Sequence, residues 1–126
     1  EWQTYTDDHL ASFFELDTYF YSSFYTNNLF PEAIKFTNAY RKWYSKDMAN
    51  TFPKYGMLGF DTAFFFLKGL HKYGSNFEEN MNQMMLTPIQ TGFKFERVNN
   101  WGGFINRKVF FVNFTKNFEL IKLDFE

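Results

Sequence analysis

The sequence predicts an α/β fold in which helices dominate the first two-thirds of the chain and strands the rest. Apolar residues recur at three- and four-residue spacing through the first two-thirds of the chain, which is typical of amphipathic helices. From Gly92 onward, β-branched and aromatic runs bounded by turn residues predict strands. No internal repeat or low-complexity linker interrupts the 126 residues, so we expect 1–126 to form a single unit. The expected order is helix, strand, three helices and a β-rich tail.

The first third of the chain predicts two helices. Thr6 precedes two acidic residues, a pattern that favours a helix start because acids stabilise the first turn, so we expect a helix over about 7–16. Pro31 is favourable at a first helical position and opens a second helix, about 31–45. The apolar stripe of this second helix comprises Ala33, Phe36, Tyr40 and Trp43.

Between these helices, residues 18–25 (TYFYSSFY) predict a strand, because they are β-branched or aromatic almost throughout. The run is apolar on both faces. We therefore expect a strand buried in a sheet that is covered on each side.

A third helix is expected from about Gly56 to Tyr73, ending at Gly74 after a loop over 46–54. Its apolar residues leave only a narrow polar edge, so the pattern predicts a helix buried nearly all round. Ser75-x-x-Glu78 matches a capping box and predicts a short helix to about Met85.

The tail predicts strands and turns. Gly92–Val98 alternates, with Phe93, Phe95 and Arg97 on one face, and a turn follows at 99–103. Residues 108–115 and 118–123 flank Lys116-Asn117, a connection typical of a β-hairpin.

Composition excludes several classes of function. The formal net charge of −1 lacks the basic footprint of a nucleic-acid binder, and the absence of cysteine excludes disulfides and thiol catalysis. No stretch approaches the ~20 apolar residues of a membrane span. His9 and His71 are interpreted as structural, so we expect no metal and no cofactor. No nucleophile–base–orienter set can be assembled, which argues against an enzyme.

The aromatic content is the most unusual feature of the composition. Twenty Phe, eight Tyr and three Trp are more than a core of this size needs, since each buried ring removes about 150–250 Å² from water. Some rings are therefore expected at an interface with a ligand or with other protein.

Six stretches together resemble a known family. They are Tyr19–Tyr25, Phe36–Tyr44, Tyr55–Ala63, His71–Gly74, Gln90–Phe95, and Trp101–Asn106 with the hairpin that follows. The second matches an F-x-x-x-Y-x-x-x-Y pattern, and the third is close to Y-a-x-x-G-Y-D-A with Phe60 where Tyr is usual. The chain resembles the C-terminal part of a type I periplasmic-binding-protein domain, the bilobed fold of branched-chain amino-acid receptors. Its amino-acid sequence resembles those of a Bacteroidetes subgroup of the family, in which this domain often follows peptidoglycan-binding LysM repeats.

The resemblance implies a partial doubly wound three-layer sandwich, one periplasmic-binding-protein-like lobe, with a C-terminal β-hairpin. It implies a non-catalytic solute-binding or sensor domain fragment of a periplasmic or otherwise extracytoplasmic protein of the cell envelope. The ligand of the full-length parent would be a small polar molecule such as an amino acid, a peptide or a peptidoglycan fragment. The family domain is longer than this chain, so an exposed sheet edge is expected here, and with it a homodimer.

Within that family the ligand crevice lies at the carboxyl ends of the strands. The expected wall of the site comprises Tyr21, Ser22, Ser23 and Tyr25, with Tyr55, Phe60 and Asp61 as neighbours. Ordinary core and strand-end packing is the alternative for the aromatic and serine residues. For Asp61 the alternative is dipole compensation with a hydrogen bond inside the domain. The alternative function is a structural module at the envelope that contacts protein or glycan and has a degenerate cleft.

Overall fold

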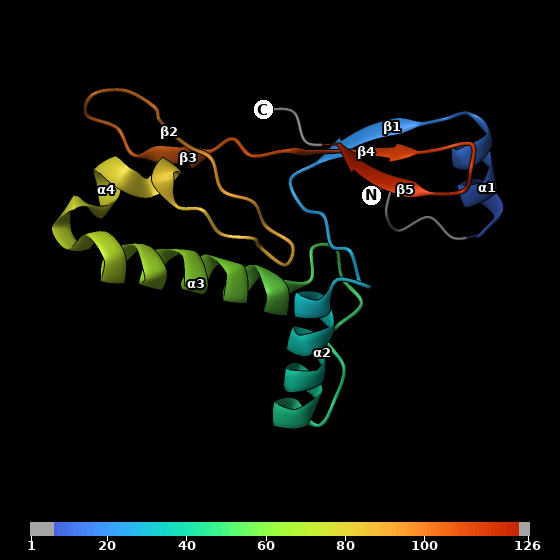
Figure 1. Ribbon diagram of the computed structural model, residues 1–126, viewed down its shortest axis with the longest axis horizontal. Helices are drawn as coiled ribbons and strands as arrows, with labels where there is room; N and C mark the ends of the chain where they lie inside the picture. The colour runs from blue at the N-terminus through green and yellow to red at the C-terminus, as the bar shows by residue number, and fades with distance from the viewer. Residues whose placement is uncertain (1–6, 124–126) are drawn as a thin grey trace. The chain divides into compact units, whose positions relative to one another are not determined.

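The computed structural model describes residues 7–123, which form two compact units (Figure 1). The terminal unit consists of two segments: the described residues up to Ser23 and those from Val109 onward. The central unit is the continuous segment Phe24–Lys108. Each unit contains helices and strands, as the sequence predicts. The sheet of the terminal unit takes its strands from both ends of the described chain.

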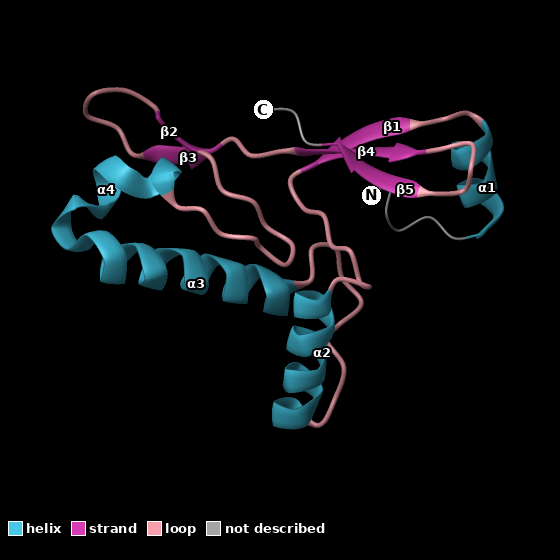
Figure 2. Ribbon diagram, in the orientation of Figure 1, coloured by secondary structure: helices cyan, strands magenta, loops and turns pink. Residues whose placement is uncertain are grey.

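The terminal unit consists of one helix and a three-stranded antiparallel sheet (Figure 2). Helix α1 (Asp7–Glu15) confirms the helix expected over 7–16, while Thr6 lies outside the described residues. The strands are β1 (Tyr19–Ser22), β4 (Phe110–Phe114) and β5 (Leu120–Leu123), in the order β1-β4-β5. The expected hairpin is confirmed by the β4–β5 pairing.

Only one face of this sheet is packed by α1. Phe20 and Phe114 lie on that face, and the ring of Phe114 is centred 5.1 Å from Phe14 and 5.3 Å from Phe20. On the opposite face Tyr21 is 72% exposed. The prediction of a strand buried on both faces is therefore wrong. The physical reason is that tyrosine has a polar hydroxyl, so an aromatic run does not require burial on each side.

All described strand pairs are antiparallel: β1 with β4, β4 with β5, and β2 (Phe95–Arg97) with β3 (Phe104–Asn106). Residues 7–123 therefore contain no parallel, doubly wound sheet, which corrects the arrangement implied by the resemblance. A parallel pair needs a crossover connection between its strands. Here the long helices follow one another with no strand between them, so no β-α-β unit is completed.

The central unit is organised around two long helices, α2 (Pro31–Tyr44) and α3 (Tyr55–Tyr73). Both confirm the helices expected at these positions, and the loop between them is also confirmed. Ala33 of α2 and Met57 of α3 are buried together with Ile89. The stripe expected on α2 is only partly buried, since Trp43 is 82% exposed.

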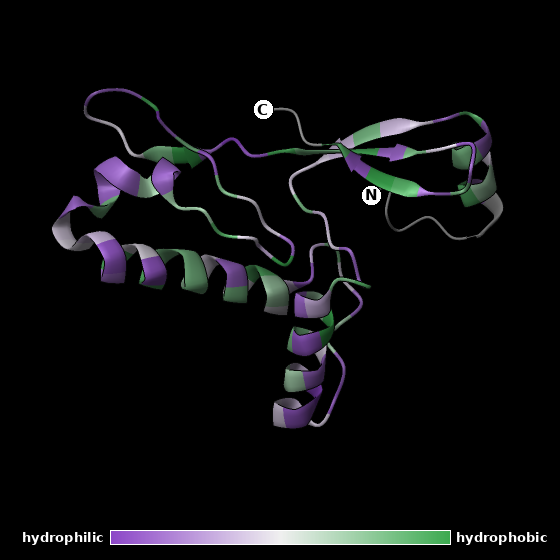
Figure 3. Ribbon diagram, in the orientation of Figure 1, coloured by the Kyte–Doolittle hydropathy of each residue, from purple (hydrophilic) through white to green (hydrophobic). Residues whose placement is uncertain are grey.

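Helix α3 is not buried all round, contrary to the prediction. Its buried residues form one row at four-residue spacing: Met57, Asp61, Phe65 and Gly69. Phe60, Phe64 and Leu67 are exposed. Hydrophobic and hydrophilic bands alternate along this helix in Figure 3. None of the helices within residues 7–123 is long and apolar enough to cross a membrane.

Short helical turns follow α3, where a short helix to about Met85 was expected. They are the 3-10 turn Gly74–Asn76, α4 (Phe77–Asn80) and the 3-10 turn Met81–Gln83. No side-chain hydrogen bond caps α4, so the predicted capping box does not form. A two-stranded hairpin, β2 (Phe95–Arg97) and β3 (Phe104–Asn106), then packs its phenylalanines against a core of Phe65, Phe77 and Met81.

Candidate functional site

The residues expected to form a ligand wall are divided between the two units. Tyr21 and Ser22 lie on β1 and Ser23 follows it, all in the terminal unit. The ring of Tyr21 is centred 6.4 Å from that of Phe111. The other four expected residues belong to the central unit: Tyr25, Tyr55, Phe60 and Asp61.

Three of these four residues serve local packing or face solvent. The backbone N–H of Tyr25 donates to the Gln90 carbonyl at 3.0 Å, and burial raises the pKa of the Tyr25 phenol above its ordinary value. Tyr55 is the exposed first residue of α3. Phe60 joins the two long helices, because its ring centre is 5.0 Å from that of Phe36.

Asp61 is buried and fully engaged inside the central unit. Its Oδ1 accepts the backbone N–H of Ile89 at 2.8 Å, and its Oδ2 accepts those of Gln90 and Thr91, each at 2.8 Å. This is the internal hydrogen bonding that was the alternative to a ligand contact. The Gln90 side chain extends the connection by accepting the Lys54 N–H at 2.9 Å and donating to the Lys54 carbonyl at 3.1 Å. Asp61 therefore anchors the 89–91 loop to α3.

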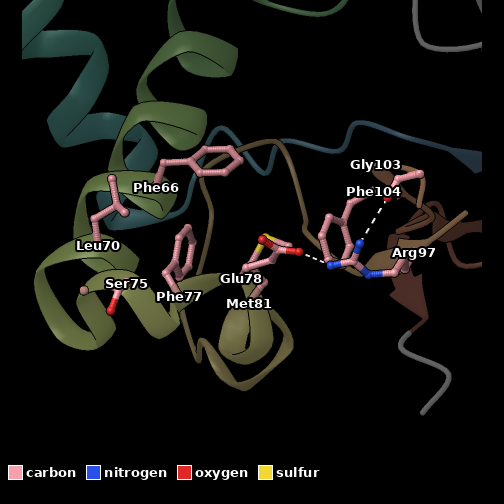
Figure 4. A pocket seen from close by; sticks show the side chains of 11 residues that line it. Phe66, Leu70, Ser75, Phe77, Glu78, Met81, Arg97, Gly103 and Phe104 are labelled. Atoms are coloured by element: carbon pink, nitrogen blue, oxygen red, sulfur yellow. Dashed lines mark hydrogen bonds and ion pairs between the residues drawn. The ribbon is translucent and has the colours of Figure 1, made fainter. Parts of the chain in front are cut away.

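A groove in the central unit is the better candidate site (Figure 4). We name it the α3–α4 groove; it has a volume of about 470 Å³ and opens to solvent. Its lining residues are Phe66, Leu70, Gly74, Ser75, Phe77, Glu78, Met81, Arg97, Gly102, Gly103 and Phe104. Phe66, Leu70 and Phe77 form an apolar wall, and Glu78 and Arg97 meet beside it.

A glycine in α3 makes room for this apolar wall. A Cβ at Gly69 would lie 2.0 Å from Cε2 of Phe77, so only glycine lets the Phe77 ring sit this close to the helix. The ring is buried and meets Phe66 edge-on, with centroids 5.8 Å apart. Phe66 itself remains 38% exposed and presents its ring to the groove.

Arg97 is held by contacts from three parts of the central unit. Its Nη1 donates to the Gly102 carbonyl at 3.1 Å, and its Nη2 pairs with Oε1 of Glu78. Its guanidinium carbon lies 4.5 Å from the centre of the Phe104 ring, a cation–π contact. The side chains of Arg97 and Glu78 are 41% and 58% exposed, so both charges are accessible from solvent.

The lining of the groove combines apolar side chains with two charged ones and one hydroxyl. The groove lining holds one hydroxyl, that of Ser75, and no histidine that could activate it. Within residues 7–123, no three His, Asp or Glu side chains gather closely enough to hold a metal ion. The apolar wall can bury an apolar group while the charged pair orients a polar one.

No groove residue was among the expected site residues. Glu78 was predicted to cap a helix, whereas its carboxylate pairs with Arg97. One signal was present in the sequence, because the alternation places Arg97 on the same strand face as Phe93 and Phe95. An arginine on an apolar strand face needs a partner, and that need could have indicated the site.

Comparisons with protein-family models, curated proteins and solved structures found no match to the chain.

Proposed function

We propose that this chain is a non-catalytic ligand-recognition module whose central unit holds its ligand in the α3–α4 groove. The observation that carries the proposal is the apolar wall of Phe66, Leu70 and Phe77 beside the accessible Arg97–Glu78 pair; Phe66 and Leu70 are its exposed members. Ligand sites of proteins combine a mostly apolar lining with a few oriented polar groups in this way. The volume of about 470 Å³ lies within the usual range for small ligands.

The sequence resemblance supports the biological setting of this proposal. A type I periplasmic-binding-protein-like domain would belong to an extracytoplasmic solute-binding or sensor protein of the cell envelope. Its ligand would be a small polar molecule such as an amino acid, a peptide or a peptidoglycan fragment. The doubly wound lobe of that family would have to include chain beyond residues 7–123, since the described strands pair antiparallel. In such a longer parent, Tyr21, Tyr25 and their neighbours stay candidates for the wall of an inter-lobe cleft.

Thermal unfolding in the presence of candidate ligands tests the proposal. Amino acids, peptides and muropeptide fragments would be screened, and a ligand that binds the folded state raises the melting temperature by mass action. Isothermal titration would then compare Phe66→Ala with Phe64→Ala. Both rings lie on α3 with similar exposure, 38% and 41%, but only Phe66 lines the groove.

We expect Phe66→Ala to weaken binding about tenfold or more and Phe64→Ala to leave it nearly unchanged, because a buried aromatic contact contributes roughly 1.5–3 kcal/mol. A melting temperature that no ligand class shifts would refute the proposed function.

The exposed apolar side chains favour a second candidate function, a structural module that contacts protein or glycan. In the central unit the most exposed of them are Leu29, Trp43, Leu67, Met85 and Trp101. Tryptophan and methionine are enriched at protein interfaces relative to the rest of the surface. If the groove binds no ligand, these side chains give the better account of the aromatic excess.

The homodimer expected from the sequence has a specific candidate edge. Within residues 7–123, β5 is an outer strand of the β1-β4-β5 sheet, and Ile121 on it is exposed. An outer strand with an apolar surface invites pairing with a second copy, and a lysine there opposes it. We expect light scattering to show a dimer that Ile121→Lys converts to monomer. A monomeric wild-type protein would rule the homodimer out.

A further inference from the structure

We infer that the α3–α4 groove takes the C-terminal end of a polypeptide whose last residue is apolar. The terminal carboxylate binds Arg97 in the place that the Glu78 carboxylate now occupies. This inference rests on the proposed function, since it assigns a ligand class to the same groove.

Arg97 is positioned independently of Glu78. The Gly102 carbonyl and the Phe104 ring hold the guanidinium on two sides, and both lie on the same hairpin as Arg97. Removing the Glu78 carboxylate therefore leaves the arginine in place with donors facing the groove. The planar guanidinium presents two parallel N–H donors to a carboxylate, which makes arginine well suited to this anion.

Glu78 is an exchangeable counter-ion for Arg97. Its side chain is 58% exposed and lies on the short helix α4. Ion pairs this exposed contribute little to stability, so a ligand carboxylate can replace that of Glu78 at small cost. Arg97 is the only cation among the lining residues, and with Glu78 displaced its charge is complementary to a carboxylate.

The apolar wall lies next to the carboxylate position and defines the rest of the ligand. Figure 4 shows Phe66, Leu70 and Phe77 gathered to one side of the Glu78–Arg97 contact. A terminal residue bound by its carboxylate would place its side chain against these three residues. Because the groove opens to solvent, the preceding residues of the polypeptide can leave it without a clash.

Fluorescence anisotropy with a labelled peptide ending in phenylalanine tests the inference on the whole chain. The free-acid peptide is expected to bind at least tenfold more tightly than the same peptide with a C-terminal amide, because the amide lacks the charge. N-acetylphenylalanine distinguishes a peptide end from a free acid, because it has the carboxylate and the side chain of the last residue but lacks the residues before it. It is expected to bind the groove more weakly than the free-acid peptide. Equal affinity for this compound and the peptide would overturn the assignment to a polypeptide end.

Two substitutions at the charged pair have opposite expected effects. Glu78→Gln removes the competing charge and should tighten binding of the free-acid peptide about two- to fivefold. Arg97→Gln should lower the affinity for the free-acid peptide to that for the amide. Arg97→Lys keeps the positive charge and should retain part of the affinity for the free-acid peptide. Arg107→Gln is the matched control, because Arg107 pairs with Glu96 on the same hairpin but does not line the groove. Circular dichroism and melting temperature verify that each variant is folded.

The outcomes separate this inference from the proposed function. Equal binding of acid and amide, with loss of both in Phe66→Ala, would overturn the carboxylate assignment and leave the groove as a ligand site. Failure of both peptides to bind would also overturn the inference, and the wider ligand panel would then decide the proposed function by itself.

Discussion

At the scale of single residues, Asp61 shows how one carboxylate can determine a loop. Its two oxygens accept three consecutive backbone N–H groups, those of Ile89, Gln90 and Thr91. A buried N–H without an acceptor costs about 1–3 kcal/mol, so a loop with three such groups would not stay packed on α3 without this side chain.

Replacement of Asp61 by asparagine tests this role. The amide has one acceptor oxygen and no charge, so Asp61→Asn should lower the free energy of unfolding by about 2–4 kcal/mol. Urea denaturation measures the change. The control is Glu79→Gln in the solvent-exposed part of α4, where a change within about 0.5 kcal/mol is expected. A loss below about 1 kcal/mol for Asp61→Asn would show that the loop holds without the carboxylate.

Tyr25 gives a prediction for alkaline pH. Burial raises the pKa of its phenol above the ordinary value of 10.0, so the folded state keeps the proton to a higher pH than the unfolded chain does. The stability from Tyr25 is therefore fully present below pH 10.0 and is lost as the pH rises through the raised pKa.

The difference in unfolding free energy between wild type and Tyr25→Phe isolates this effect from other titrating groups. It should be constant near neutral pH and shift in favour of Tyr25→Phe above about pH 10. A difference that stays constant across the alkaline range would contradict the assigned burial effect.

At the scale of elements, α3 combines a narrow buried row with a broad exposed apolar surface. The row follows four-residue spacing and ends at Gly69, which receives the Phe77 ring. The two glycines in the middle of α3 therefore have different roles. Gly69 is packed against a ring, whereas a Cβ at Gly59 would have no neighbour within 4 Å.

Alanine at these two positions should change stability in opposite directions. Gly59→Ala should stabilise the protein by about 0.5–1 kcal/mol, because alanine favours a helix more than glycine does. Gly69→Ala should destabilise it by about 1–3 kcal/mol despite the same gain, because the methyl group displaces Phe77. Chemical denaturation of both variants provides the comparison, and stabilisation by Gly69→Ala would show that Phe77 moves without cost.

The elements were predictable from sequence where a local signal marks them. Pro31 and Gly74 mark helix ends, and the α2 and α3 boundaries fall within one residue of those expected. Burial was not predictable, since a surplus of rings makes every face of α3 look apolar. The groove was missed because Arg97 and Glu78 are 19 residues apart and each has a plausible local explanation. Strand β3 was not predicted, because its three residues, Phe104–Asn106, are too few to show an alternating pattern.

At the scale of the whole molecule, the two units differ in how the chain builds them. The central unit is one continuous segment with both of its core clusters inside it, around Met57 and around Phe65. The terminal unit needs segments from both ends of the described chain. The mixed helix and strand content was predictable from local patterns. This division was not, because strand pairing between distant segments has no local signature.

The central unit should therefore fold by itself. A polypeptide of residues 24–108 is expected to keep a near-ultraviolet circular dichroism signal and cooperative unfolding, since both clusters remain complete. A polypeptide of residues 1–108 is the matched comparison, and it should lose protection of the β1 amides because β4 is missing. A 24–108 polypeptide without cooperative unfolding would show that the central unit depends on the terminal one.

The β1–β4 pairing also determines the order in which the protein acquires its structure. Phe20 must find Val112, and the entropy lost in closing a loop grows with the length of flexible chain between the partners. A central unit that has already folded removes most of that flexible length. During synthesis β4 emerges only after the whole central unit, so we expect the terminal sheet to assemble last. It should likewise be the first to open, with amide protons of β1 exchanging faster than those in the middle of α3.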